Sequence, residues 1–136
     1  MDRTFRRRGR RSATRFVPLS LALLAITIGL SPAGCQAAQP AEVPAELKKG
    51  EAAFNANCAR CHGARGVGTP NGPLLVHKIY EPNHHGDAAF QRAATLGVRA
   101  HHWQFGDMPK IPAVTPADVD EIVKYVRWLQ RQAGIF

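Results

Sequence analysis

The feature that most constrains this chain is the segment 58–62, Cys-Ala-Arg-Cys-His, which has the pattern C-x-x-C-H. Two cysteines three residues apart in a helical segment project to the same side, so both thiols can bond to one flat molecule. The pattern is the attachment signature of a c-type haem, in which each thiol adds to one vinyl group of the porphyrin. The next residue then lies beneath the iron as an axial imidazole ligand. The motif predicts one covalent haem c, attached to Cys58 and Cys61 and ligated by His62.

Two other kinds of site share part of this pattern. A bare C-x-x-C is typical of thiol redox proteins, but those proteins have a flanking strand, and neither flank here resembles one. A structural zinc site needs further ligands, and the only other cysteine in the chain is Cys35. The histidine directly after the second cysteine favours haem attachment over both alternatives.

The positive charge of the chain is concentrated near its N-terminus. Residues 1–37 carry seven arginines and one aspartate, a net charge of +6, whereas residues 38–136 carry eleven Lys or Arg and nine Asp or Glu, a net charge of +2. The sum is the net charge of +8 of the whole chain of 136 residues. Because the longer part lacks a basic stripe, nothing in it indicates nucleic-acid binding.

The first 35 residues have the pattern of an export signal. Their arginines precede a mostly apolar run from Val17 to Leu30, which is shorter than the roughly 20 residues that span a membrane. Small residues follow the run, as they do before a cleavage site. We therefore expect residues 1–35 to direct export to the periplasm or to the outer face of the cytoplasmic membrane. The pattern disfavours the alternative of a buried core helix.

The cleavage site has two alternatives. Residues 31–35, Ser-Pro-Ala-Gly-Cys, resemble the bacterial lipobox, in which the cysteine becomes the lipidated first residue, although Pro32 stands where leucine is usual. The other cut follows Ala37 and discards Cys35, and an uncleaved signal anchor is a third outcome. Lipidation would explain a thiol left without a partner in an exported chain. Residues 36–43, rich in Ala and Pro, would then tether the protein to the membrane.

The folded domain is expected over residues 44–136 and begins with a helix. Pro44 suits the first turn of that helix, and Glu46 suits its positive end. The residues at helical spacing on one face are Leu47, Gly50, Phe54 and Cys58. A glycine on this face predicts a close helix crossing, because it lets a partner side chain lie directly on the backbone.

The last helix has the clearest signals. Thr115 suits the N-cap, Pro116 the first helical position, and Asp118 the third position of a capping-box arrangement. The expected apolar stripe consists of Val119, Ile122, Val123, Val126 and Leu129, broadened by Tyr125 and Trp128. Gly134 lies past the expected end.

A third helix is predicted over residues 87–96, ended by Gly97. The side chains expected to turn inward are Phe90, Ala93, Ala94 and Leu96. Trp103 and Phe105 follow, either as core aromatics or at the porphyrin edge, where an indole N–H can donate to a propionate. No segment has a strand pattern, so the expected fold class is all-α.

Two spaced motifs lie in the first and last helices: G-x-x-x-F-x-x-x-C-x-x-C-H over residues 50–62, and I-x-x-Y-V over residues 122–126. Together they resemble the class I (mitochondrial-type) cytochrome c family, in a monohaem, bacterial exported form. The resemblance covers about residues 44–132. It implies a small cytochrome c fold of three to four helices wrapped around one covalent haem, with the N- and C-terminal helices crossing.

The resemblance also implies two further site residues. Residues 72–74, Gly-Pro-Leu, are similar to a segment in which the proline carbonyl accepts a hydrogen bond from the proximal histidine, so Pro73 is expected to bind His62. Met108, in the segment Gly-Asp-Met-Pro, stands where the family places its second axial ligand. Thioether sulfur favours Fe(II) and raises the reduction potential. An ordinary loop proline and a packing methionine are the alternatives.

Histidines compete with Met108 for the second axial position. Five lie between the haem motif and that methionine: His77, His84, His85, His101 and His102. Bis-histidine ligation would lower the reduction potential. The two His-His pairs can instead bind copper or zinc, or be solvated.

The function expected from these features is one-electron transfer, without an enzymatic activity. With His62 and Met108 on the two axial sites, the iron has no open position for a substrate. The expected donor and acceptor are larger redox proteins. Two alternatives stay open: an electron-entry subunit of a membrane oxidase or dehydrogenase, and a haem sensor or enzyme with a labile sixth site.

Overall fold

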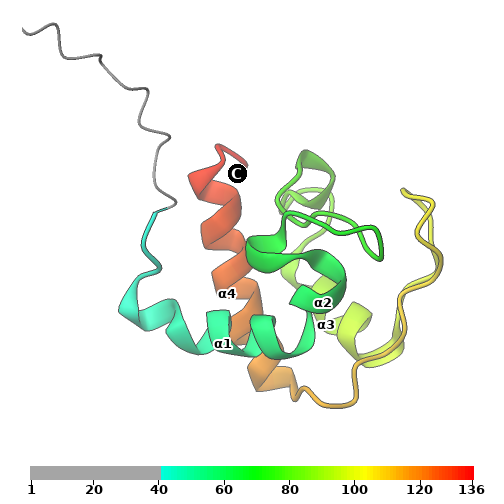
Figure 1. Ribbon diagram of the computed structural model, residues 1–136, viewed down its shortest axis with the longest axis horizontal. Helices are drawn as coiled ribbons and strands as arrows, with labels where there is room; N and C mark the ends of the chain where they lie inside the picture. Colours follow the sequence, from blue (N-terminus) through cyan, green and yellow to red (C-terminus); the bar gives the residue numbers. More distant parts are fainter. Residues whose placement is uncertain (1–40) are drawn as a thin grey trace, which may run out of the picture. The chain divides into compact units, whose positions relative to one another are not determined.

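The computed structural model describes residues 41–136, which form helices joined by irregular segments and include no strand (Figure 1). The helices are α1 (Lys48–Asn57), α2 (Ala59–His62), α3 (Asp87–Leu96) and α4 (Pro116–Gln132), with 3-10 turns η1 (Ala45–Leu47), η2 (Ala64–Gly66) and η3 (Lys78–Tyr80). The predicted all-α fold class is confirmed. The expected export signal, Cys35 and residues 36–40 of the tether lie outside the described residues. Within residues 41–136, no helix is long and apolar enough to cross a membrane.

The first and last helices, α1 and α4, cross (Figure 1), and Gly50 of α1 lies against Glu121 and Tyr125 of α4. A Cβ at position 50 would collide with the carbonyl oxygen of Glu121 and lie 3.1 Å from the Cβ of Tyr125. The missing side chain therefore lets the two backbones touch. The predicted crossing of the N- and C-terminal helices is present.

The core lies along this crossing. Phe54 of α1 and Tyr125 of α4 are fully buried, and their ring centroids are 5.6 Å apart. The predicted stripe of α4 is buried, including Trp128. Burial of this apolar face contributes most of the helix's stability, because isolated helices of this length are marginal in water.

The predicted start of α4 is confirmed in detail. The hydroxyl of Thr115 accepts a hydrogen bond from the amide of Asp118 at 3.2 Å, and the Asp118 carboxylate accepts one from the Thr115 amide at 3.1 Å. This reciprocal capping satisfies two amides that have no partner inside the helix.

Three details differ from the sequence expectation. Pro44 has an extended ψ of 148° and precedes η1 instead of joining the first helical turn. The α-helix itself starts later, at Lys48. Leu96 was expected to turn inward with the rest of α3, but it is 75% exposed, because it ends the helix at the edge of a cavity and not over the core.

Candidate haem-binding site

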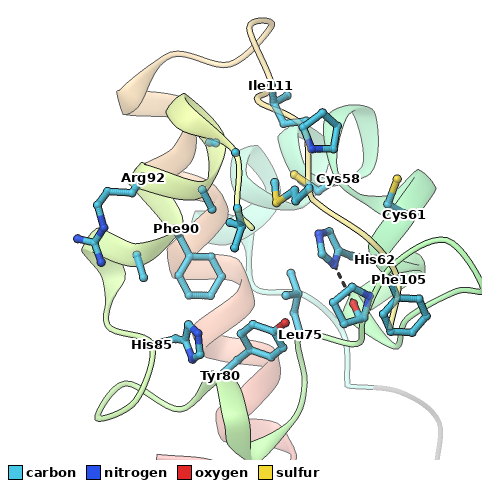
Figure 2. Close-up of a pocket in the computed structure, with 18 of the residues that line it drawn as sticks. Cys58, Cys61, His62, Leu75, Tyr80, His85, Phe90, Arg92, Phe105 and Ile111 are labelled. Carbon is cyan, nitrogen blue, oxygen red and sulfur yellow. Dashed lines mark hydrogen bonds between the residues drawn. The ribbon is translucent and has the colours of Figure 1, made fainter. Parts of the chain in front are cut away.

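A cavity of about 660 Å³ opens between α1, α2, α3 and the segment that precedes α4. All five predicted site residues line it: Cys58, Cys61, His62, Pro73 and Met108. Its apolar walls include Leu75, Phe90 and Ile111, which Figure 2 shows around the same space as the two cysteines and His62. The fold therefore brings together residues that are up to 50 positions apart in the sequence.

The local backbone fixes the two thiols and the imidazole on one helical turn. Cys58 ends α1, where its amide donates to the Phe54 carbonyl, and the single-turn helix α2 follows. The His62 amide donates to the Cys58 carbonyl at 2.9 Å, so the motif is one continuous helical turn. Gly63, with φ of +76°, then turns the chain away, a conformation that a residue with a side chain rarely adopts.

The His62 ring is oriented by a hydrogen bond. Its Nδ1 lies 2.8 Å from the carbonyl oxygen of Pro73, the contact drawn as a dashed line in Figure 2. A carbonyl only accepts, so Nδ1 carries the proton and Nε2 keeps its lone pair for a metal. Burial lowers the pKa of His62, against a smaller opposing effect of the bond to Pro73, and therefore favours the neutral ring that binds iron.

The segment that carries Pro73 is held against the haem motif. The Thr69 hydroxyl donates to the Cys61 carbonyl at 2.6 Å. A Cβ at Gly72 would lie 2.8 Å from the same carbonyl oxygen, so only glycine permits this approach. These contacts hold the Pro73 carbonyl within hydrogen-bond distance of the His62 Nδ1.

The environment of Cys58 disfavours the two rival uses of a C-x-x-C pair. Burial and the nearby Cys61 raise the pKa of the Cys58 thiol to about 11. Redox-active cysteines and zinc ligands act as thiolates, and their surroundings lower the pKa. A half-buried thiol of raised pKa that faces an apolar cavity suits a thioether bond to a porphyrin.

Met108 reaches the cavity through a chain reversal. It pairs with Val98, each amide donating to the other residue's carbonyl at 2.9 Å. The intervening loop is closed by a hydrogen bond from the Ala100 amide to the Asp107 carboxylate at 2.9 Å. Met108 is half-buried and faces the same cavity as His62. The two candidate axial ligands therefore come from separate segments, one before and one after α3.

Four of the five competing histidines line the same cavity, and His77 does not. His77 caps η3, its Nδ1 accepting from the Ile79 amide at 3.1 Å. These four residues form the two His-His pairs, and Figure 2 shows His85 beside Tyr80. Sequence reasoning did not identify Tyr80 as a lining residue, because no spacing relates it to the motif.

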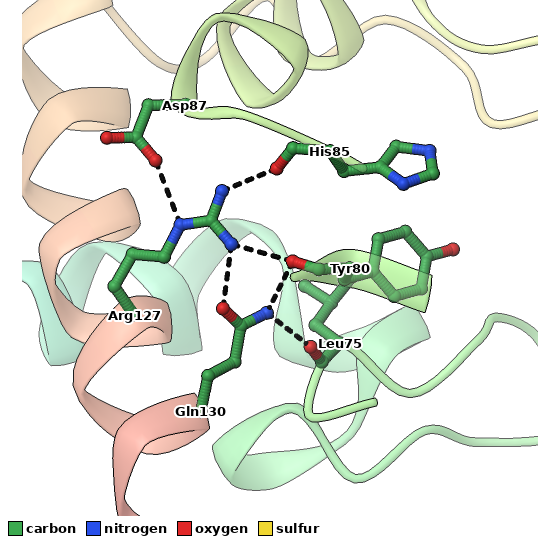
Figure 3. Close-up of polar contacts among 6 residues, drawn as sticks. All are labelled: Leu75, Tyr80, His85, Asp87, Arg127 and Gln130. Carbon is green, nitrogen blue, oxygen red and sulfur yellow. Dashed lines mark hydrogen bonds and ion pairs between the residues drawn. The ribbon is translucent and has the colours of Figure 1, made fainter. Parts of the chain in front are cut away.

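The sequence also gave no indication that Arg127 and Gln130 of α4 organise the chain around the cavity (Figure 3). Arg127 is buried and donates to the Tyr80 carbonyl at 2.6 Å, to the His85 carbonyl, and to the Asp87 carboxylate at 2.8 Å. Gln130 donates to the Leu75 carbonyl at 2.9 Å. These two side chains fix the segment between η2 and α3 that forms one wall.

The described residues fit a haem group. The cavity offers two thiols and a neutral imidazole on one helical turn, a thioether from another segment, and apolar walls. The Nε1 of Trp103 is buried with no hydrogen-bond partner among residues 41–136. A buried donor needs an acceptor, and a porphyrin propionate supplies one.

Comparison with known proteins agrees with this geometry. The sequence model of the family described as Cytochrome c matches residues 47–130, more than half of the chain. No curated protein matches the chain significantly. The matched range contains α1, the haem motif, Met108 and most of α4. The chain belongs to the cytochrome c family, and it binds haem c covalently through Cys58 and Cys61.

Proposed function

We propose that this protein is a one-electron carrier whose haem iron is ligated by His62 and Met108. Membership of the cytochrome c family implies haem-based electron transfer. Bound haem c supplies an iron that alternates between Fe(II) and Fe(III). The observation that carries the finer proposal is that His62, with Nε2 free, and Met108 line one cavity with both thiols.

The roles of the individual residues follow from their contacts. The Pro73 carbonyl keeps the His62 proton on Nδ1 and increases the electron donation of Nε2. Met108, as a soft sulfur ligand, favours Fe(II) and raises the reduction potential. Leu75 and Phe90 exclude water from the site. A rigid pair of axial ligands also limits the rearrangement that accompanies a change of oxidation state.

We infer from the same arrangement that the protein is a carrier and not an enzyme, because His62 and Met108 would leave bound haem no open ligand position. Its donor and acceptor would be larger redox proteins that contact an exposed haem edge. The segment 1–35 supports export to the periplasmic side, and Cys35 supports a lipid anchor. An electron-entry subunit of a membrane complex is the second candidate, favoured by the tether over residues 36–43.

Replacing Met108 with alanine tests the assignment of the second axial ligand. We expect the far-red sulfur-to-iron absorbance band of the oxidised protein to disappear. The reduction potential should fall on the order of 0.2 V, since axial ligands set haem potentials over a range of about 0.8 V. The measurements are an optical spectrum and a redox titration of the haem-loaded variant.

Phe105→Leu is the matched control, because Phe105 lines the same cavity from the same segment but offers no ligand atom. It should keep both the band and the potential. A band that survives in Met108→Ala would assign the sixth ligand to another residue, with the two His-His pairs as the first candidates.

A further inference from the structure

Four histidines have no role in the proposed haem ligation: His84 and His85 in the turn before α3, and His101 and His102 in the loop after α3. The fold brings the two pairs together. The ligand nitrogens of His84, His85 and His102 all lie within 4.8 Å of one another. We propose that these three histidines form a binding site for a divalent transition-metal ion, with Cu(II) bound more tightly than Zn(II).

The spacing of two donors matches a single metal ion. The Nε2 atoms of His84 and His102 are 3.3 Å apart. Metal–nitrogen bonds of about 2.0–2.1 Å in a tetrahedral site place two ligand nitrogens roughly 3.3–3.4 Å apart. An N–H···N hydrogen bond between two rings has a similar length, so the third imidazole is what distinguishes a metal site from a histidine pair.

That third imidazole, His85, is oriented as metal-ligating histidines are. Its Nδ1 lies 2.6 Å from the Ile79 carbonyl oxygen. Because the carbonyl only accepts, Nδ1 carries the proton and Nε2 has a free lone pair. The ring centroids of His85 and His102 are 5.1 Å apart, so small side-chain rotations bring the three nitrogens onto one ion.

Both backbone segments of the cluster are anchored. The turn that carries His84 and His85 is held by the buried Arg127, which donates to the His85 carbonyl, as Figure 3 shows. The loop that carries His102 is closed by the bridge between Val98 and Met108 and by the Ala100–Asp107 hydrogen bond. Less conformational entropy is then lost when an ion binds, because the segments are already positioned.

The chemistry of the donors selects the metal. The grouped ligands are imidazoles, and no carboxylate or thiolate of residues 41–136 belongs to the group. Imidazoles suit copper, zinc and nickel, and the general order of affinity places Cu(II) above Zn(II).

Bound metal would connect two segments that border the haem cavity. His102 belongs to the same loop as Met108, whereas His84 and His85 precede α3. An ion at this cluster therefore ties the loop of the proposed axial methionine to the rest of the domain. We expect the thermal unfolding midpoint of the haem-loaded protein to rise in Zn(II) and to return when a chelator is added.

The direct test is calorimetric titration of the oxidised, haem-loaded protein with CuCl₂ and ZnCl₂ at pH 7. The oxidised form is used because Fe(II) can reduce Cu(II). We expect one ion per chain, micromolar or tighter affinity for Cu(II), and weaker affinity for Zn(II). His84→Ala and His102→Ala should each reduce the affinity by about tenfold or more.

His101→Ala is the matched control. His101 is an exposed neighbour of His102, but its Nδ1 is paired with the Arg99 carbonyl at 2.8 Å and it lies outside the group of three. This variant should bind Cu(II) with nearly the affinity of wild type. His84→Ala, His102→Ala and His101→Ala should all keep the wild-type haem spectrum. The proposal is overturned if wild type binds no ion at micromolar concentration, or if His101→Ala loses as much affinity as His102→Ala.

Discussion

Replacing Gly50 with alanine is expected to lower the free energy of unfolding of the haem-loaded protein by about 3 kcal/mol or more. Alanine favours a helix over glycine by about 1 kcal/mol, so local propensity alone predicts a gain. The added methyl group, however, collides with the backbone carbonyl of Glu121, and a backbone cannot move aside as a flexible side chain can. The α1–α4 crossing must open, which loosens the contact between Phe54 and Tyr125.

Gly86→Ala is the control for this prediction. Gly86 has a φ of −62°, and the nearest atom to a Cβ there is the Pro82 carbonyl oxygen at 3.4 Å, an ordinary contact. Its free energy of unfolding in denaturant titrations should stay within about 1 kcal/mol of wild type. Equal stability of Gly50→Ala and wild type would refute the close crossing.

Replacing Arg127 with methionine is expected to destabilise the protein by about 3 kcal/mol. The change keeps an apolar stem but leaves the His85 carbonyl and the side-chain oxygen of Gln130 without this donor, at roughly 1–3 kcal/mol each, whereas the Tyr80 carbonyl still accepts from Gln130. The ion pair with Asp87 adds little, because that carboxylate is 69% exposed. Denaturant titration gives the stability, and hydrogen exchange should show faster exchange in residues 75–87.

Arg131→Met provides the comparison, because Arg131 is an exposed arginine on the same helix. This substitution should change the free energy of unfolding by no more than about 0.5 kcal/mol, as most surface substitutions do. Arg127→Lys keeps the charge but loses the planar guanidinium group with its several N–H donors. It should therefore be more stable than Arg127→Met but less stable than wild type. If Arg127→Met were no more destabilising than Arg131→Met, the hydrogen bonds of Arg127 would not stabilise the fold.

Features set by short-range spacing were predictable from the sequence. The haem motif occupies one helical turn, the Thr115–Asp118 capping box spans a single turn, and the stripe of α4 repeats with the helical period. The presence of Met108 in the cavity followed only from the family resemblance. The residues next to Met108 in the sequence do not indicate that it enters the cavity, because its placement depends on the pairing with Val98.

Contacts between irregular segments were not predictable. Arg127 bonds to the Tyr80 carbonyl, 47 residues away, and any residue type presents such a carbonyl. The approach of His84 to His102 joins a turn and a loop across 18 positions, with no periodic pattern in either. The sequence suggested metal binding by the His-His pairs, but only the fold shows which three of the four histidines lie close together.

With His62 and Met108 on both axial positions of the iron, as proposed, electron transfer is the chemistry left to it. Adding carbon monoxide to the reduced, haem-loaded wild-type protein tests this most directly. We expect an unchanged absorbance spectrum, because a stable Met108 ligand blocks the gas. Rapid and complete formation of a carbon monoxide complex would contradict it and would favour a sensor or an enzyme.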